Sequence, residues 1–144
     1  MKSSCDWLIV RPIFLYGWNY PWGRDNWVTK IIKRLKAGQE VKLVTDSYTQ
    51  PTYAYDVAKY IWHMVENSGP NNRYMKHNVA GPDILNLYGF GRKVKEVFDL
   101  KGTIAPVKSE AFNIAKRPVD TTFESDMTDC HSVEEGLKAM KDER

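Results

Sequence analysis

Short strand-like runs alternate with amphipathic helical segments along this sequence, and this order limits the possible folds more than any other feature. The apolar run Trp7–Val10 continues after Arg11-Pro12 into Ile13–Gly17, as expected of a strand buried on both faces of a parallel sheet. Further short strands are predicted at 41–44, 77–80 and 104–107. Since strands that alternate with helices are typical of α/β proteins, we predict an α/β fold.

The helical segments are predicted from apolar side chains that recur at i, i+3, i+4 and i+7. They cover approximately residues 26–37, 54–66, 86–100 and 133–140. Asp25 or Asn26, both favoured N-cap residues, starts the first helix. In the second helix, Val57, Ile61 and Val65 are predicted to face the core.

The composition favours one globular domain that spans residues 1–144, because 42% of the residues are hydrophobic. The net charge of +3 (21 Lys and Arg against 18 Asp and Glu) is spread along the chain, so we expect no nucleic-acid partner. No apolar run approaches the ~20 residues of a membrane span, and we expect no secretory signal. With only Cys5 and Cys130, we expect a reducing, cytoplasmic setting.

Two short motifs are typical of proteins that bind or use a dinucleotide cofactor, but the sequence around them does not support that function. The GxG at Gly89-Phe90-Gly91 lacks a third glycine and continues into a helical pattern, so we interpret it as a close helix contact or a loose first turn of a helix. Tyr55 and Lys59 form a Tyr-x-x-x-Lys pair, in which a lysine lowers the pKa of a phenol on the same helix face. Such a pair is expected by chance in a chain of this composition. We therefore predict that Lys59 is solvated and that Tyr55 packs at the helix start.

The histidines form no recognisable metal or nucleophile site. His63, His77 and His131 are not paired at metal-ligand spacing, and only His131 has an adjacent ligand type, Cys130. Adjacent side chains diverge and no further ligand pair completes a four-coordinate site, so we predict no metal. No nucleophile-elbow sequence is present, and we assign no catalytic residue.

Two loops contain residues suited to ligand binding. The aromatic-rich segment 16–23 follows a predicted buried strand, and ligands of open α/β sheets bind beyond the carboxyl ends of the strands. Its rings could stack on a base or a sugar, or they could cover the core or a partner surface. Arg117, preset by Pro118, could clamp a phosphate, or it could be a solvent-exposed loop residue.

Five segments, taken in order, resemble motifs of the extended short-chain dehydrogenases/reductases, most closely the dTDP-4-dehydrorhamnose reductases. They are the R-P-x-x-x-Y-G strand and loop at 8–17, the N-F-V-like helix start at 25–30, the P-T-Y-x-x-D-L-A-like element at 46–58, the strand end at 78–81 and the R-P turn at 115–120. The resemblance implies the last elements of a Rossmann-type parallel sheet plus a small α/β substrate-binding lobe.

The resemblance covers only the carboxyl-terminal half of such an enzyme. In that family, the glycine fingerprint and the catalytic Tyr-x-x-x-Lys lie upstream of the R-P-x-x-x-Y-G strand, so we expect the N-terminal Rossmann core to be absent. Tyr55 and Lys59 fall on a different helix from the catalytic one. Hence we expect this oxidoreductase-like chain to be inactive alone.

The resemblance also implies a ligand, a cofactor and their contact residues. The ligand is a nucleotide-sugar similar to a dTDP-4-keto-6-deoxysugar, and the cofactor is NADP or NAD. The substrate-binding residues that it implies are Tyr16, Asn26, Trp27, Val28, Gln50, Thr52 and Arg117, and the cofactor-binding residues are Arg11 and Pro12.

Several departures from the family pattern leave the function open. Thr49 replaces the usual Gly, Pro12-Ile13 replaces Thr-Ser, and Glu124 replaces Asp, so the sugar is undetermined. The alternatives are a non-catalytic regulatory or interaction module of the same fold, a fragment of another nucleotide-sugar epimerase or dehydratase, and a fragment with no function of its own. An exposed edge at Trp7–Val10 predicts a partner, either a separate N-terminal half or a second copy.

Overall fold

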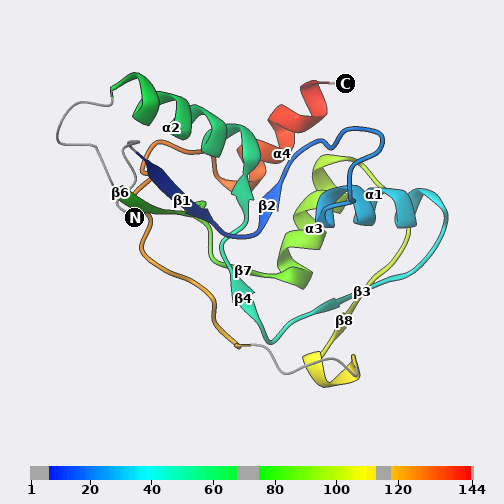
Figure 1. Ribbon diagram of the computed structural model, residues 1–144. Helices are drawn as coiled ribbons and strands as arrows, with labels where there is room; N and C mark the ends of the chain where they lie inside the picture. Colours follow the sequence, from blue (N-terminus) through cyan, green and yellow to red (C-terminus); the bar gives the residue numbers. More distant parts are fainter. Residues whose placement is uncertain (1–6, 68–74, 113–117, 144) are drawn as a thin grey trace.

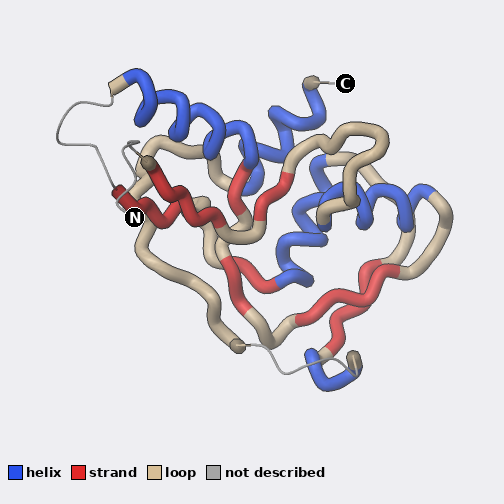
Figure 2. The backbone as a smooth tube through the Cα atoms, in the orientation of Figure 1, coloured by secondary structure: helices blue, strands red, loops and turns tan. Residues whose placement is uncertain are grey.

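The computed structural model describes residues 7–67, 75–112 and 118–143, and it has the α/β fold that the sequence predicts. Figures 1 and 2 show the four α-helices across the upper part of the view, with most of the strands beside or below them. The predicted turn at 68–72 and the predicted phosphate ligand Arg117 lie outside the described residues.

The helices and most of the longer strands lie close to where the sequence predicts them. The strands are β1 (Leu8–Pro12), β2 (Leu15–Tyr16), β3 (Val41–Val44), β4 (Tyr48–Thr49), β5 (Thr52–Tyr53), β6 (Met75–Val79), β7 (Leu85–Asn86) and β8 (Ile104–Val107). The helices are α1 (Trp27–Lys36), α2 (Ala54–Glu66), α3 (Leu87–Val97) and α4 (Val133–Asp142), with a 3₁₀ turn at Ser109–Ala111.

The strands form four two-stranded pairs. Three pairs are parallel, namely β1–β6, β2–β5 and β3–β8, and the fourth, β4–β7, is antiparallel. Parallel pairing between strands that are distant in sequence requires crossover connections, and α1, α2 and α3 lie in these connections.

The main core lies between α1, α3, α4 and the strands β2, β3 and β5. Phe90 of α3 is fully buried there and meets the ring of Tyr16 edge-on at 5.6 Å. The predicted role of the GxG segment is confirmed, because a Cβ on Gly91 would clash with the side chain of Leu43. Gly91 therefore allows α3 to approach β3 closely, and it has no part in a phosphate loop.

The prediction that the first strand is buried on both faces is wrong. Phe14 adopts a positive φ of 44°, which divides the apolar run into β1 and β2. Within β1, Ile9 is exposed, and β1 pairs only with β6 among the described strands. Burial of a face depends on what packs against it, and the face of β1 that carries Ile9 and Arg11 is exposed in the described part of the chain.

The predicted inner face of α2 is only partly buried. Val57 is buried against Val79 and Met127 in a small second core. Ile61 and Val65, one and two turns further on, are 38% and 54% exposed. The 3.6-residue pattern is correct, but the described part of the chain does not cover the second half of this stripe.

None of the helices in the described part of the chain is both long and apolar enough to cross a membrane.

Candidate functional site

A groove of about 510 Å³ lies between α1 and β3, and basic and aromatic side chains line it. Trp27, the first residue of α1, is 39% exposed, and Phe112 lies beside the same groove after the 3₁₀ turn. The ammonium group of Lys30 stands 5.3 Å from the centre of the Trp27 ring. The groove therefore combines an aromatic surface with positive charge.

Three of the cations in this groove have no carboxylate partner among the described residues. Lys33 is neutralised, because its Nζ lies 2.7 Å from Oδ1 of Asp25, and this hydrogen bond lowers the pKa of Asp25. Lys30, Arg34 and Lys42 also line the groove, and none of them forms an ion pair with a described carboxylate. Such a surface attracts an anion, and Arg34 can bind a phosphate through two parallel hydrogen bonds.

Asn26 lies between the groove residues Asp25 and Trp27 and makes contacts in two directions. Its Oδ1 accepts hydrogen bonds from the backbone N–H groups of Val28 (2.9 Å) and Thr29 (3.2 Å), which caps α1. Its Nδ2 donates to the carbonyl oxygen of Gly17 at 2.6 Å and to Oδ1 of Asn19 at 3.0 Å. One side chain thus fixes both the start of α1 and the aromatic loop.

The structure does not gather all the predicted substrate residues in one place. Trp27 lines the groove, and Asn26 lies next to it. The side chains of Tyr16 and Val28 are fully buried in the main core. Direct contact of Tyr16 or Val28 with a ligand stays a prediction.

Gln50 and Thr52 form a separate buried junction. Nε2 of Gln50 donates to the carbonyl oxygen of Gly81 at 3.3 Å, and its Oε1 accepts from the N–H of Phe123 at 2.8 Å. Oγ1 of Thr52 donates to the carbonyl oxygen of Gln50 and accepts from the N–H of Gly81, both at 3.0 Å. These two side chains join β5 to the chain after β6, and their contact with a ligand stays a prediction.

The predicted cofactor residues Arg11 and Pro12 are both exposed at the carboxyl end of β1. Ligands of parallel sheets bind at that end of a strand, so the position is compatible with the prediction, which stays untested.

The aromatic segment 16–23 covers the core at one position, and ligand stacking by its exposed rings stays a prediction. Trp18 covers the core, because its ring meets Phe98 edge-on at 5.8 Å and its Nε1 donates to the carbonyl oxygen of Met140 at 2.6 Å. Tyr20 and Trp22 are 75% and 83% exposed, with their rings stacked at 5.4 Å.

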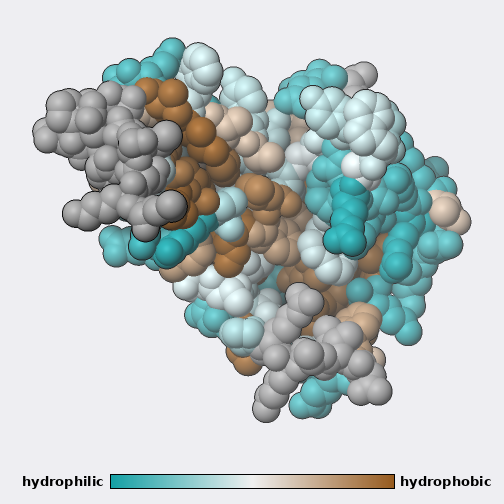
Figure 3. Space-filling view, in the orientation of Figure 1, coloured by the Kyte–Doolittle hydropathy of each residue, from teal (hydrophilic) through white to brown (hydrophobic). Residues whose placement is uncertain are grey.

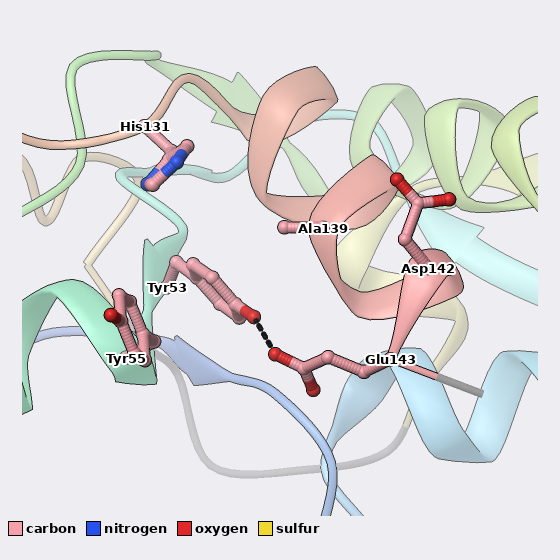
Figure 4. Close-up of a pocket in the computed structure, with 6 residues that line it drawn as sticks. All are labelled: Tyr53, Tyr55, His131, Ala139, Asp142 and Glu143. Atoms are coloured by element: carbon pink, nitrogen blue, oxygen red, sulfur yellow. Dashed lines mark hydrogen bonds between the residues drawn. The ribbon is translucent and has the colours of Figure 1, made fainter.

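A second pocket, of about 390 Å³, lies between the start of α2 and the end of α4 (Figure 4). Tyr53 and Tyr55 form its aromatic side, and Asp142 and Glu143 supply carboxylates. The hydroxyl of Tyr53 donates to Oε1 of Glu143 at 2.8 Å. Because this pocket is acidic and the α1–β3 groove is basic, a phosphate-bearing ligand is favoured only in the groove.

His131, which also lines the second pocket, is held by a buried carboxylate. Nδ1 of His131 lies 2.7 Å from Oδ1 of Asp56, and its backbone N–H donates to Oδ2 at 2.9 Å. Asp56 therefore anchors the segment before α4 to the start of α2. No group of three or more His, Cys, Asp or Glu suited to a metal ion occurs among the described residues.

The Tyr55–Lys59 pair is not arranged for proton transfer. Nζ of Lys59 lies 3.0 Å from Oδ2 of Asp129, and both side chains are exposed. Tyr55 is exposed, with its ring 6.0 Å from that of Tyr53. Lys59 is thus solvated as predicted, although it is paired with Asp129.

Alkaline pH is expected to destabilise the fold through Tyr53 and Tyr16. Burial, reinforced for Tyr53 by the hydrogen bond to Glu143, raises the pKa of both phenols well above 10.0. The unfolded chain releases these protons first, so the free energy of unfolding is unaffected below about pH 10 and falls above it. Urea midpoints at pH 8.5 and 10.5 measure this fall. The Tyr53→Phe variant should show a smaller fall, and an unchanged one contradicts the assignment.

Sequence reasoning missed most of the residues that line the groove. Lys30, Arg34, Lys42 and Phe112 are not among the substrate-binding residues that the sequence predicts. One signal was present, because residues 27, 30 and 34 are spaced three and four apart and share a helix face. Nothing local could show that Lys42 and Phe112 lie opposite this face.

Three comparisons with known proteins bear on the family and the fold of this chain. A family model described as the RmlD substrate binding domain matches residues 1–139. The spore coat polysaccharide biosynthesis protein SpsK of Bacillus subtilis (strain 168) is 29% identical over 117 residues, which is 81% of this chain and 38% of SpsK.

The dTDP-4-dehydrorhamnose reductase of Bacillus anthracis str. Ames, solved in complex with NADP, has a TM-score of 0.82 and 27% identity, and the match covers 95% of this chain and 48% of that one. The UDP-glucuronic acid 4-epimerase of Bacillus cereus, with a TM-score of 0.71 and 17% identity, shares the fold and is covered to 44%. The chain therefore spans about half the length of these structures or less, and 38% of SpsK.

Proposed function

The chain belongs to the RmlD substrate-binding domain family, and on that premise we propose that it binds a nucleotide-sugar in the groove between α1 and β3. The observation that carries the proposal is the exposed Trp27 ring beside three cations without carboxylate partners in the described ranges. The ligand is a dTDP-linked 4-keto-6-deoxysugar or a close relative.

The groove offers a place for each part of such a ligand. Trp27 and Phe112 supply aromatic surface for the base, because every nucleic-acid base has a flat π-face that can stack on an aromatic ring. Lys30, Arg34 and Lys42 supply charge for the diphosphate. The N-terminal end of α1, capped by Asn26, adds the positive end of the helix dipole.

The other residues implied by the family resemblance take supporting positions in this proposal. Tyr16, Val28 and Thr52 are buried, so they hold the backbone around the site, and Gln50 fixes the β5 junction. Contact of Arg117 with the diphosphate stays a prediction, since this residue lies outside the described residues. Arg11 and Pro12, exposed on β1, face the nicotinamide cofactor.

The complete activity in this proposal is the reduction of the keto sugar by NADPH or NADH. The described residues do not fit the cofactor's pyrophosphate, because the only GxG segment is packed against Leu43. We therefore propose that a separate nucleotide-binding half holds the cofactor and that this chain alone transfers no hydride. The alternative is a regulatory module that binds the nucleotide-sugar without turnover, which the same fold supports.

Calorimetric titration with dTDP tests the binding site. We expect the Trp27→Ala variant to bind dTDP about tenfold more weakly, since stacking on one ring contributes about 1–3 kcal/mol. The matched control is Trp62→Ala, because Trp62 is an exposed tryptophan on α2 that does not line the groove. Equal affinity in both variants, or no binding by the parent chain, contradicts the proposal.

A further inference from the structure

Two residues of the α1–β3 groove depend on the parallel pair of β3 and β8. Lys42 lies within β3, opposite Ala105 of β8, and Phe112 follows β8 directly after the 3₁₀ turn Ser109–Ala111, which Figure 1 shows in yellow. The Phe112 side chain is 37% exposed, so a ligand can reach it. The place of this ring is therefore set by the contacts that fix the 3₁₀ turn.

Asp46, two residues after the end of β3, fixes this turn through Ser109. The backbone N–H of Ser109 is shared between Oδ1 of Asp46 at 3.0 Å and Oδ2 at 3.2 Å, and the Ser109 hydroxyl donates to Oδ2 at 3.1 Å. Ser109 in turn accepts a hydrogen bond from the N–H of Phe112 at 3.1 Å. The first N–H groups of a helical turn have no partner within the turn, and Asp46 supplies one from a segment 63 residues away.

The segment that carries Asp46 is itself held in place. The backbone N–H of Thr45 donates to the carbonyl oxygen of Val107 at 3.0 Å, and its hydroxyl donates to the same oxygen at 3.2 Å. Nδ2 of Asn86, at the start of α3, donates to the carbonyl oxygen of Thr45 at 3.0 Å. Asp46 is therefore anchored to both β8 and α3, and its carboxylate carries that fixed position over to Ser109.

The carboxylate of Asp46 is charged at neutral pH. Partial desolvation raises its pKa, but the hydrogen bonds from Ser109 outweigh this effect and lower the pKa below its ordinary value. A charged acceptor binds an N–H or hydroxyl group more strongly than a neutral one. The contact between Asp46 and Ser109 is thus strong enough to order the turn, although both residues lie at the surface.

We propose that Asp46 is a positioning residue of the nucleotide site, which fixes the 3₁₀ turn through Ser109 and so holds the Phe112 ring where the base of the ligand stacks. This inference rests on the proposed function and adds a residue that touches no ligand. Trp27 is held independently, because Asn26 caps α1. Most of the cations are independent of Asp46 as well, because they lie on α1, whose surface Figure 3 shows as mostly hydrophilic.

Calorimetric titration of an Asp46→Ala variant with dTDP and with inorganic pyrophosphate tests the proposal. We expect dTDP to bind about fivefold more weakly, because the base loses an ordered ring on which to stack. Pyrophosphate has no base, so the variant should bind it at least as tightly as the parent chain does. Ser109→Ala, which removes only the hydroxyl donor, should give a smaller loss of the same kind.

The matched control is Asp129→Ala, which removes one carboxylate at an exposed position outside the groove. It should bind both ligands as the parent chain does, which accounts for the change in net charge. Parent affinity for dTDP in the Asp46→Ala variant, or equal weakening of dTDP and pyrophosphate, overturns the proposal.

A double variant shows whether Asp46 acts through Phe112. Asp46→Ala combined with Phe112→Ala should bind dTDP no more weakly than Phe112→Ala alone, because the ring that Asp46 positions is already missing. If the two losses add, Asp46 acts by another route and the assignment is wrong.

A fluorinated phenylalanine at position 112 gives a second readout, which needs no ligand. Its fluorine NMR resonance should move toward the value of a fully solvated ring in the Asp46→Ala variant, and an unchanged resonance contradicts the positioning role. This measurement also separates the two proposals. If the resonance moves but the parent chain does not bind dTDP, the proposed function is wrong while the contact from Asp46 to Phe112 is confirmed.

Discussion

A Gly81→Ala variant is expected to lose about 3–5 kcal/mol of its free energy of unfolding. The added Cβ would lie on the backbone oxygen of Pro51, far inside contact distance. A backbone oxygen cannot turn aside as a flexible side chain can. The variant must therefore separate the two segments, and the Thr52 and Gln50 hydrogen bonds to Gly81 would be strained or lost.

Urea unfolding followed by tryptophan fluorescence measures this loss, and Gly38→Ala is its control. Gly38 has a positive φ of 71° with no atom within 4 Å of an added Cβ. Its substitution carries only the backbone penalty, about 1 kcal/mol. If both variants lose the same free energy, close packing at Gly81 is not important for the fold.

The contacts of Gly81 with Gln50 and Thr52 also show which parts of the fold could be predicted from the sequence. Helices α1, α2 and α3 have repeating apolar positions, and Asn26 is a favoured cap, so local patterns locate them closely. The strands β2, β4, β5 and β7 have only two residues each, which is too short for any period to be visible. Their pairing depends on contacts such as that between Gln50 and Gly81, 31 residues apart.

Burial was harder to predict than secondary structure, because it depends on what surrounds an element. Val57, Ile61 and Val65 have the spacing of a buried stripe, yet only Val57 is covered in the described part of the chain. The pattern is compatible with a helix that packs in a larger assembly. The spacing of apolar residues therefore predicts the helix and its apolar face, but it does not predict how far that face is covered.

Of the substrate residues implied by the family resemblance, Trp27 lines the candidate groove, and the residues on its other walls were missed. The family resemblance identified Asn26 and Trp27 at the start of α1. It also grouped Trp27 with Gln50, whose side chain lies in a separate buried junction. The groove is formed where α1 faces β3 and the turn after β8, and this pairing of β3 with β8 joins residues about 60 positions apart.

Reversing two charges of the groove is expected to have the largest effect on ligand binding. In an Arg34→Glu, Lys42→Glu double variant, two attractive contacts with the diphosphate become repulsive. At a solvent-facing site each reversal changes the binding free energy by about 1–1.5 kcal/mol, so dTDP affinity should fall about 100-fold. Thymidine, which has no phosphate, should bind with the same low affinity to the parent and to the variant.

The control for this prediction is Lys36→Glu combined with Lys101→Glu, which makes the same change in net charge at exposed positions outside the groove. If the phosphate contacts are local, the control should lose no more than about threefold, and this loss should vanish at high salt because exposed charges are screened over about 10 Å. A control that loses as much as the groove variant would mean that net charge alone attracts the nucleotide. In that case Arg34 and Lys42 do not form a specific diphosphate site.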